Sequence, residues 1–146
     1  APEHSEGAIL ALMNKPSFKI YEKFVEKFNR INKSLNKKQF LVSYFLSAHP
    51  GADLEGALEL ALYLAKNRIS PEQIQDYIPL PMTSSAAIYY TGKDPMTGRE
   101  VHVARNPRER KLQRALIQSR QSSNKRYVLE ALKKLDKLHL AGKLLH

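Results

Sequence analysis

Apolar residues recur along the chain with the spacing of one helix face, and this spacing predicts three helices in the first half. From Ser17, apolar side chains return every three or four residues as far as Leu35. The same spacing predicts a shorter helix over residues 6–13 and another that begins after Asp53 and ends near Asn67. Charged residues lie mostly opposite the apolar stripe of the longest helix, so we expect that helix to bury one side.

Two apolar runs have no helical spacing and predict strands. Residues 39–47 (QFLVSYFLS) are nearly all apolar and rich in aromatics, which suits a parallel strand covered on both faces. Residues 74–80 predict a second strand, which follows one helical turn at residues 70–73 (SPEQ). A helix separates the two runs, and this order indicates parallel strands joined by a right-handed crossover.

Turn-forming residues follow the second strand, and we place a boundary there between residues 1–90 and residues 91–146. The sequence DPMTG at residues 94–98 predicts a tight reversal. A strand over residues 100–104 is expected after the reversal. The second part is then mostly helical.

Positive charge is concentrated in this second part. Asn106 and Pro107 predict the start of a basic helix that ends near Gln121, and Ser123 predicts the cap of another. The net charge is +10, of which residues 91–146 carry +9 (14 Lys and Arg against 5 Asp and Glu). Clustered cations attract phosphate without specifying sequence, so one alternative function is a small nucleic-acid-binding module with RNA as partner. A solvated structural tail is favoured over it, because no aromatic residues interleave the cations as a stacking platform needs.

Composition excludes several other classes of function. The 146 residues contain no cysteine, so the chain offers no disulfide, no thiolate zinc site and no ligands for an iron–sulfur cluster. Apolar runs are too short for a membrane helix, and the start lacks the blocks of a signal peptide, so we expect a cytoplasmic protein without a membrane partner. The chain opens on Ala-Pro, which suggests a segment of something longer. We find no P-loop, GxGxxG, HExxH or metal-spaced histidine motif, and assign no catalytic residue and no metal ligand.

Polar residues nevertheless stand where the predicted parallel strands end, and ligands in α/β folds bind at such ends. Glu3 and His4 precede the first helix, residues 47–51 end one strand and residues 81–85 end the next. From spacing alone, His49 before Pro-Gly is favoured as a loop residue that ends a strand. Position by itself therefore leaves the site open.

A series of motifs then resembles a known family. They are APEH, ILALMNKP, KKQFLVSYFLSAHPG, QIQDYIPLPMTSS, IYYTGKDPMTGREVHV and ERKLQRAL. In this order they resemble the C-terminal part of YgiQ-type radical SAM proteins, over about residues 1–118. The resemblance implies an α/β fold, the C-terminal portion of a partial (βα)6 radical SAM barrel with a helical, basic C-terminal extension. APEH would end the fourth strand, QFLVSYFLS would be the fifth and QIQDYIPLP the sixth.

The resemblance also implies a function. Radical SAM enzymes use S-adenosylmethionine (SAM) and a 4Fe-4S cluster. This chain lacks the cluster cysteines, so we expect it to be inactive alone and to pair with the remainder of its own radical SAM domain; the substrate stays open. The cofactor-binding candidates by resemblance are the residues at three strand ends: Glu3, His4, Ser47, His49, Gly51, Pro81 and Thr83. Gly51 would let the backbone approach the cofactor, and His49 would line the pocket rather than catalyse. An incomplete sheet edge predicts marginal stability or self-association.

Overall fold

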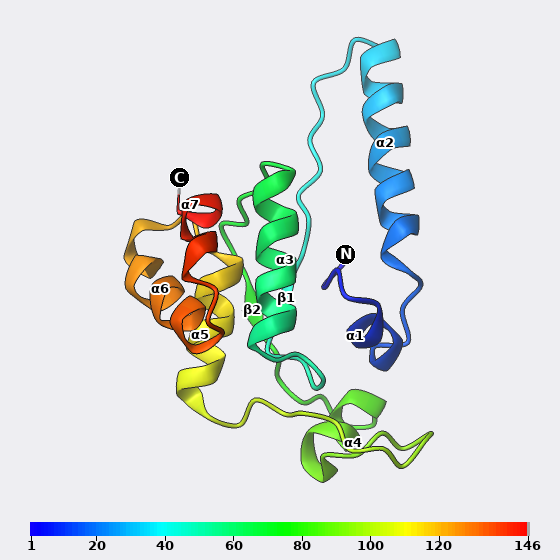
Figure 1. Cartoon of the computed structure of the whole chain (residues 1–146). Helices are drawn as coiled ribbons and strands as arrows, with labels where there is room; N and C mark the ends of the chain where they lie inside the picture. The colour runs from blue at the N-terminus through cyan, green and yellow to red at the C-terminus, as the bar shows by residue number, and fades with distance from the viewer. Residues whose placement is uncertain (146) are drawn as a thin grey trace.

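Helix α3 (Leu54–Lys66) packs on a small parallel sheet and beside a group of C-terminal helices (Figure 1). The computed structural model describes residues 1–145. The other elements are α1 (Gly7–Leu12), α2 (Phe18–Ser34), β1 (Leu46–Ser47), β2 (Gln75–Asp76), α4 (Ser84–Thr91), α5 (Pro107–Ile117), α6 (Lys125–Lys134) and α7 (Ala141–Leu144), with 3-10 turns at Ser122–Asn124 and Leu138–Leu140. The fold is therefore mixed and rich in helix. No helix within the described range is long and apolar enough to cross a membrane.

Three backbone segments run parallel to one another. Strand β1 pairs with β2, with Ser47 opposite Asp76. Glu3 forms a parallel bridge to Phe45, in which its N–H donates to the Tyr44 carbonyl at 2.9 Å and its carbonyl accepts from the Leu46 N–H at 2.9 Å. The predicted order of strand, helix and parallel strand is confirmed, and the APEH segment lies alongside the strand that follows it in the sequence.

Helix α3 buries two faces. One face joins α5, α6 and α7 in a cluster built from Ala57, Leu58, Ala61, Leu112, Ala115, Leu116, Tyr127, Val128, Ala131, Leu132 and Leu144. The other face packs on the sheet through Leu60 and Leu64, which meet Phe45, Ile74 and Ile117. The helix starts where predicted, because the Asp53 carboxylate accepts a hydrogen bond from the Gly56 N–H at 2.8 Å.

Helix α4 was not predicted, because its residues follow Pro81 and begin with a run of hydroxyl side chains typical of turns. The Thr83 hydroxyl caps its first turn by accepting from the Ala86 N–H at 3.1 Å. Gly92 ends it with a left-handed backbone (φ 70°). The reversal at residues 94–98 is confirmed, since the chain returns to pair Lys93 with Glu100 in an antiparallel bridge.

Several predicted boundaries are wrong. Residues 39–44 are extended but unpaired apart from Tyr44, and the side chains of Phe40 and Val42 are 86% and 97% exposed rather than covered. No neighbouring segment among the described residues packs over the side chains of Phe40 and Val42. The helical turn at residues 70–73 does not form, and strand structure near residues 100–104 is limited to the single bridge at Glu100.

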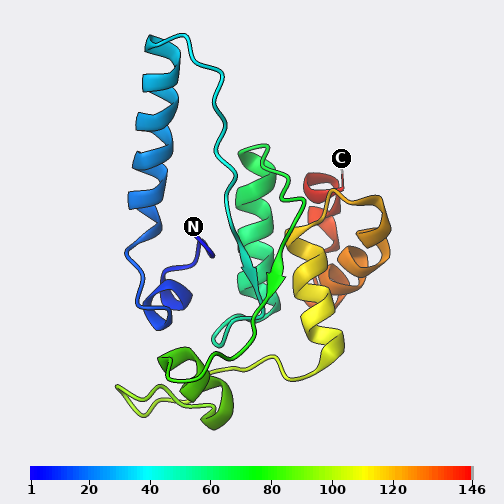
Figure 2. The ribbon, with the colours of Figure 1, turned by 180° about the vertical axis from the view of Figure 1, so that it is seen from behind.

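Helix α2 also departs from its prediction. Its apolar stripe is largely open to solvent, with Phe24 and Leu35 54% and 61% exposed. Contact with the rest of the chain is made near its start, where the Phe18 ring meets Tyr63 of α3 edge to face at 4.8 Å between centroids. Figure 2 shows α2 and the segment after it projecting away from the C-terminal helices.

The last helices differ from their predicted limits in smaller ways. Asn106 caps α5 by accepting from the Arg108 N–H at 2.8 Å, as predicted, but the helix ends at Ile117. Ser123 lies in a 3-10 turn, and α6 begins two residues later. A helix end shifted by a few residues leaves the apolar stripe of each helix on the core.

Candidate functional site

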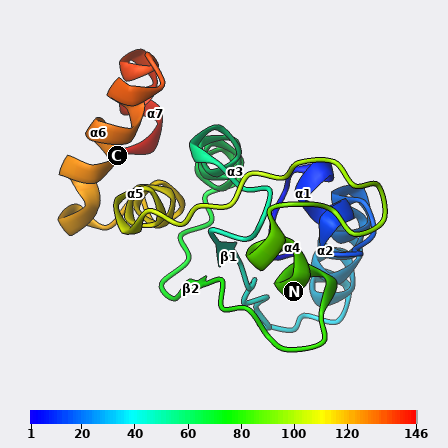
Figure 3. The same cartoon turned by 90° about the horizontal axis from the view of Figure 1, so that it is seen from below.

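The carboxyl ends of the parallel segments point toward α4, which lies beyond them in both side views (Figures 1 and 2). Figure 3, seen from below, shows the hairpin after α4 reaching toward α1. The peptide N–H of Gly51 donates to the His102 carbonyl at 2.7 Å and so ties this connection to the end of β1. The seven candidate residues are therefore brought to one end of the sheet or to the loops that leave it.

Backbone strain is present at Glu3, directly after β1 and in the loop that follows β2. Four of the seven non-glycine residues with positive φ over residues 1–145 simply follow helix ends: Asn14, Asn36, Arg68 and Asp136. The other three are Glu3 (φ 62°), Ala48 (φ 56°) and Met82 (φ 65°). Each such conformation costs about 1–3 kcal/mol and persists where the surroundings fix it, as happens at functional sites. The strain therefore marks the same three places as the sequence candidates.

His49 is almost fully buried, with 2% of its surface exposed. Its Nδ1 lies 2.7 Å from the Pro50 carbonyl and its Nε2 lies 2.8 Å from the Ser85 hydroxyl. A carbonyl only accepts, so Nδ1 carries the proton and Nε2 accepts from Ser85. Burial lowers the pKa of His49, which favours this neutral form.

His4 is buried nearby. Its Nδ1 accepts from the Glu6 N–H at 3.1 Å, a contact that turns the chain into α1. Burial first, and then the neighbouring His49, lower the pKa of His4 to about 4. Both imidazoles are therefore neutral at pH 7. Their ring nitrogens bond to protein atoms, which indicates a structural role beneath the site.

Ser47 and Gly51 also lie beneath the surface or against neighbouring side chains. Ser47 is fully buried, and its hydroxyl has no hydrogen-bond partner among the described residues. An ideal Cβ placed on Gly51 would lie 2.5 Å from Cδ1 of Leu12. A side chain, rather than open space, thus occupies the gap that the absence of a Cβ leaves at Gly51.

The remaining candidates face solvent. Glu3 is half-buried and pairs with Lys15 at 3.0 Å, whereas Pro81 and Thr83 are exposed. Pro81 and Thr83 flank Met82, whose side chain is fully exposed. Glu3, Pro81 and Thr83 are therefore the candidates that a ligand would meet first.

Two residues of the site were not among the sequence candidates. Ser85 holds His49, and the Tyr77 ring packs edge to face on the His49 imidazole at 4.9 Å between centroids. Burial raises the pKa of Tyr77, and its hydroxyl is buried without a partner in the described part of the chain. A cap at Thr83 with a glycine nine residues later, at Gly92, is the sequence signal that could have placed α4 and hence Ser85.

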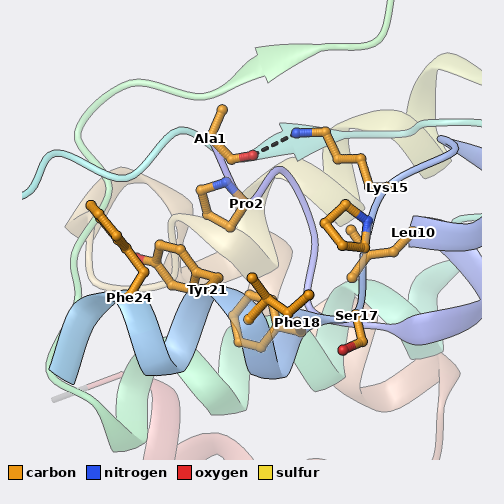
Figure 4. A pocket seen from close by; sticks show the side chains of 10 residues that line it. Ala1, Pro2, Leu10, Lys15, Ser17, Phe18, Tyr21 and Phe24 are labelled. Atoms are coloured by element: carbon orange, nitrogen blue, oxygen red, sulfur yellow. Dashed lines mark hydrogen bonds between the residues drawn. The ribbon is translucent and has the colours of Figure 1, made fainter. Parts of the chain in front are cut away.

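The structure also has two hollows that none of the seven candidate residues lines. One, of about 290 Å³, is formed by the first residues and the start of α2, and the Lys15 ammonium donates across its edge to the Ala1 carbonyl at 2.5 Å (Figure 4). The other, of about 900 Å³, separates residues 41–44 from residues 68–75. Across the described residues, no three His, Asp or Glu side chains gather closely enough to hold a metal ion.

Comparison with known proteins gives a consistent family. Residues 72–144 match a domain of unknown function, DUF3362. A UPF0313 protein of Methanosarcina mazei is 44% identical over 142 residues, 97% of this chain and 23% of that protein. For UPF0313 proteins of Methanosarcina acetivorans and Clostridium botulinum (strain Okra) the identities are 45% and 44%, again over 97% of this chain, which covers 19% and 22% of them. The chain thus spans about a fifth of the length of these relatives. No solved structure gives a significant match.

The similarity extends further than the motifs indicated. Because 142 residues align and the domain match ends at residue 144, the predicted limit near residue 118 is wrong. Packing gives the physical reason, since α6 and α7 share one core with α3 and α5. The chain belongs to the YgiQ-type family of UPF0313 proteins and contains a DUF3362 domain.

Proposed function

We propose that the full-length protein is a radical SAM enzyme and that this segment supplies the last strand ends of its partial barrel. The observation that carries the proposal is the positive φ of Glu3, within the first parallel segment, of Ala48, directly after β1, and of Met82, in the loop six residues after β2. Ligands in barrels bind at these ends, and strain of this kind is retained where function requires it. The family resemblance supplies the chemistry.

The candidates divide into two groups by exposure. Glu3, Pro81 and Thr83 would contact SAM directly, since they reach the surface. His4, Ser47, His49 and Gly51 would form the wall behind them. When bound, a reduced 4Fe-4S cluster supplies the electron that cleaves SAM, and its thiolate ligands come from outside these 146 residues because they contain no cysteine.

The remainder of the radical SAM domain is the partner that the proposal requires. Phe40 and Val42 present apolar side chains on a segment that pairs with no strand along residues 39–43. A preceding or neighbouring part of the domain would bury them. This region and α2 contribute several of the exposed large apolar side chains of the described residues.

A nucleic-acid-binding role gains no support from the basic residues. Arg108 pairs with Glu130, Arg114 with Asp76 and Lys137 with Glu55. The Arg110 guanidinium donates to the Tyr77 carbonyl at 2.8 Å. Several of these cations thus join the C-terminal helices to one another or to the rest of the chain, and these contacts need no phosphate ligand.

Equilibrium binding of SAM to the full-length protein, purified without oxygen and with its cluster reconstituted, tests this proposal. We expect saturable binding that Glu3→Gln weakens about ten-fold, the size of one lost hydrogen bond to a charged group. Glu100→Gln, on the exposed hairpin, is the matched control and should bind as the unmodified protein does. Absence of SAM binding by a protein that holds its full cluster would reject the proposal.

A further inference from the structure

His49 connects two strained turns. Ala48, immediately before it, has a left-handed backbone and is 1% exposed, so the turn that directs His49 is buried and fixed. The imidazole then donates to the Pro50 carbonyl and accepts from Ser85 in α4. Met82, the second strained residue, lies three positions before Ser85.

The loop that carries Met82 is held at both ends. At its start, the Tyr77 N–H donates to the Ser47 carbonyl at 2.8 Å, and Arg110 donates to the Tyr77 carbonyl at 2.8 Å. At its end, α4 begins, and Ser85 in its first turn reaches His49. Between these anchors, residues 78–82 (IPLPM) project apolar side chains, with Ile78, Leu80 and Met82 60%, 63% and 104% exposed.

Helix α4 needs such an anchor. It has eight residues, and a helix this short is unstable without tertiary contacts. Its C-terminal end is fixed by Arg105, which donates to the carbonyls of Tyr89 and Tyr90. At its N-terminal end, the bond to His49 links the first turn of α4 to the end of β1, while the Thr83 hydroxyl donates to the Leu80 carbonyl and accepts from the Ala86 N–H.

We infer that His49 is a positioning residue. Through its hydrogen bond to Ser85 it fixes α4, and it thereby holds the IPLPM loop (residues 78–82) in place at the face of the molecule where we propose that SAM binds. The inference rests on the proposed function for the identity of that face. His49 would act through Ser85 and would not touch SAM. This role differs from that of a pocket-lining residue, since the imidazole points its two nitrogens at protein atoms.

Amide hydrogen exchange in the full-length protein tests the anchor without reference to activity. Ser85→Ala should speed exchange of residues 84–91 about five-fold, as the loss of one hydrogen bond of about 1 kcal/mol implies. Ser85→Thr keeps the hydroxyl and should restore slow exchange. Ser84→Ala is the control, because that side chain is exposed and makes no such bond. Equal exchange in Ser85→Ala and Ser84→Ala would overturn the inference.

The affinity for SAM tests whether the hydrogen bond between His49 and Ser85 supports cofactor binding. Ser85→Ala should raise the dissociation constant of SAM several-fold, and Ser85→Thr should reverse the loss of affinity. Faster exchange with unchanged SAM affinity would overturn the link to the cofactor face. If the unmodified protein with its full cluster binds no SAM, the proposed function fails, and the exchange comparison still decides whether His49 anchors α4.

Discussion

Leu12 fills the space beside Gly51, so that an ideal Cβ on Gly51 would lie 2.5 Å from the Leu12 Cδ1 atom. Gly51 also has φ 93°, a conformation that side chains disfavour. Gly51→Ala should therefore lower the free energy of unfolding by about 2–4 kcal/mol, from strain and overpacking together. Urea denaturation measures the change.

Gly98 separates the two causes. It has φ 70°, but nothing lies within 4 Å of an ideal Cβ there. Gly98→Ala should cost only the backbone term, about 1 kcal/mol. Equal losses for the two variants would mean that Leu12 moves aside freely, and the packing explanation for Gly51 would then be incorrect.

Acid should destabilise the chain through His4. The folded pKa of about 4 lies below the ordinary value of 6.5, so between these pH values the unfolded chain binds a proton that the folded chain does not. The free energy of unfolding therefore falls as the pH drops from 6.5 toward 4. A difference of this size corresponds to about 3 kcal/mol. Urea titrations at pH 7 and pH 4 give the slope.

The substitution His4→Asn separates the contribution of His4 to the pH dependence from the contributions of the carboxylates and the other histidines. The amide oxygen of asparagine can accept from the Glu6 N–H as Nδ1 does, but it does not titrate. The variant should lose about 3 kcal/mol less than the unmodified chain over the same pH range. Identical slopes in His4→Asn and the unmodified chain would refute the assignment to His4.

Exposed apolar residues should make the isolated chain self-associate. Phe40 and Val42 project from an extended segment without strand partners, and such edges pair with other chains. The double substitution Phe40→Lys and Val42→Lys should shift the sedimentation profile toward monomer. Met96→Lys, at an equally exposed apolar position on the hairpin, is the control. A monomeric unmodified chain at concentrations of tens of micromolar would contradict the expectation.

The sequence predicted those elements whose signals are local. Helix α3 follows from an apolar stripe and the Asp53 cap, and the reversal at residues 94–98 follows from its turn residues. The parallel order of the strands also followed, because it depends on the alternation of strand and helix. Strand length did not, since residues 39–44 need neighbours that their own side chains cannot supply.

The positions of the candidate residues in the fold could be predicted, but their contacts could not. The resemblance brought Glu3, His49 and Thr83 to one end of the sheet. The Ser85 contact was missed, because α4 begins in a run of hydroxyl residues that also suits a loop, and a hydrogen bond across 36 positions leaves no local pattern. Burial likewise separates His4 and Ser47 from the exposed candidates, and it depends on packing that no single motif encodes.

Formation of 5′-deoxyadenosine from SAM tests the central claim most directly. The full-length protein, prepared without oxygen, reconstituted with iron and sulfide and reduced with dithionite, should release deoxyadenosine over a SAM-only control. Replacement of the cluster cysteines upstream of this segment should abolish the release. Deoxyadenosine at the background level, from protein with a full, reduced cluster and bound SAM, would contradict the radical SAM account.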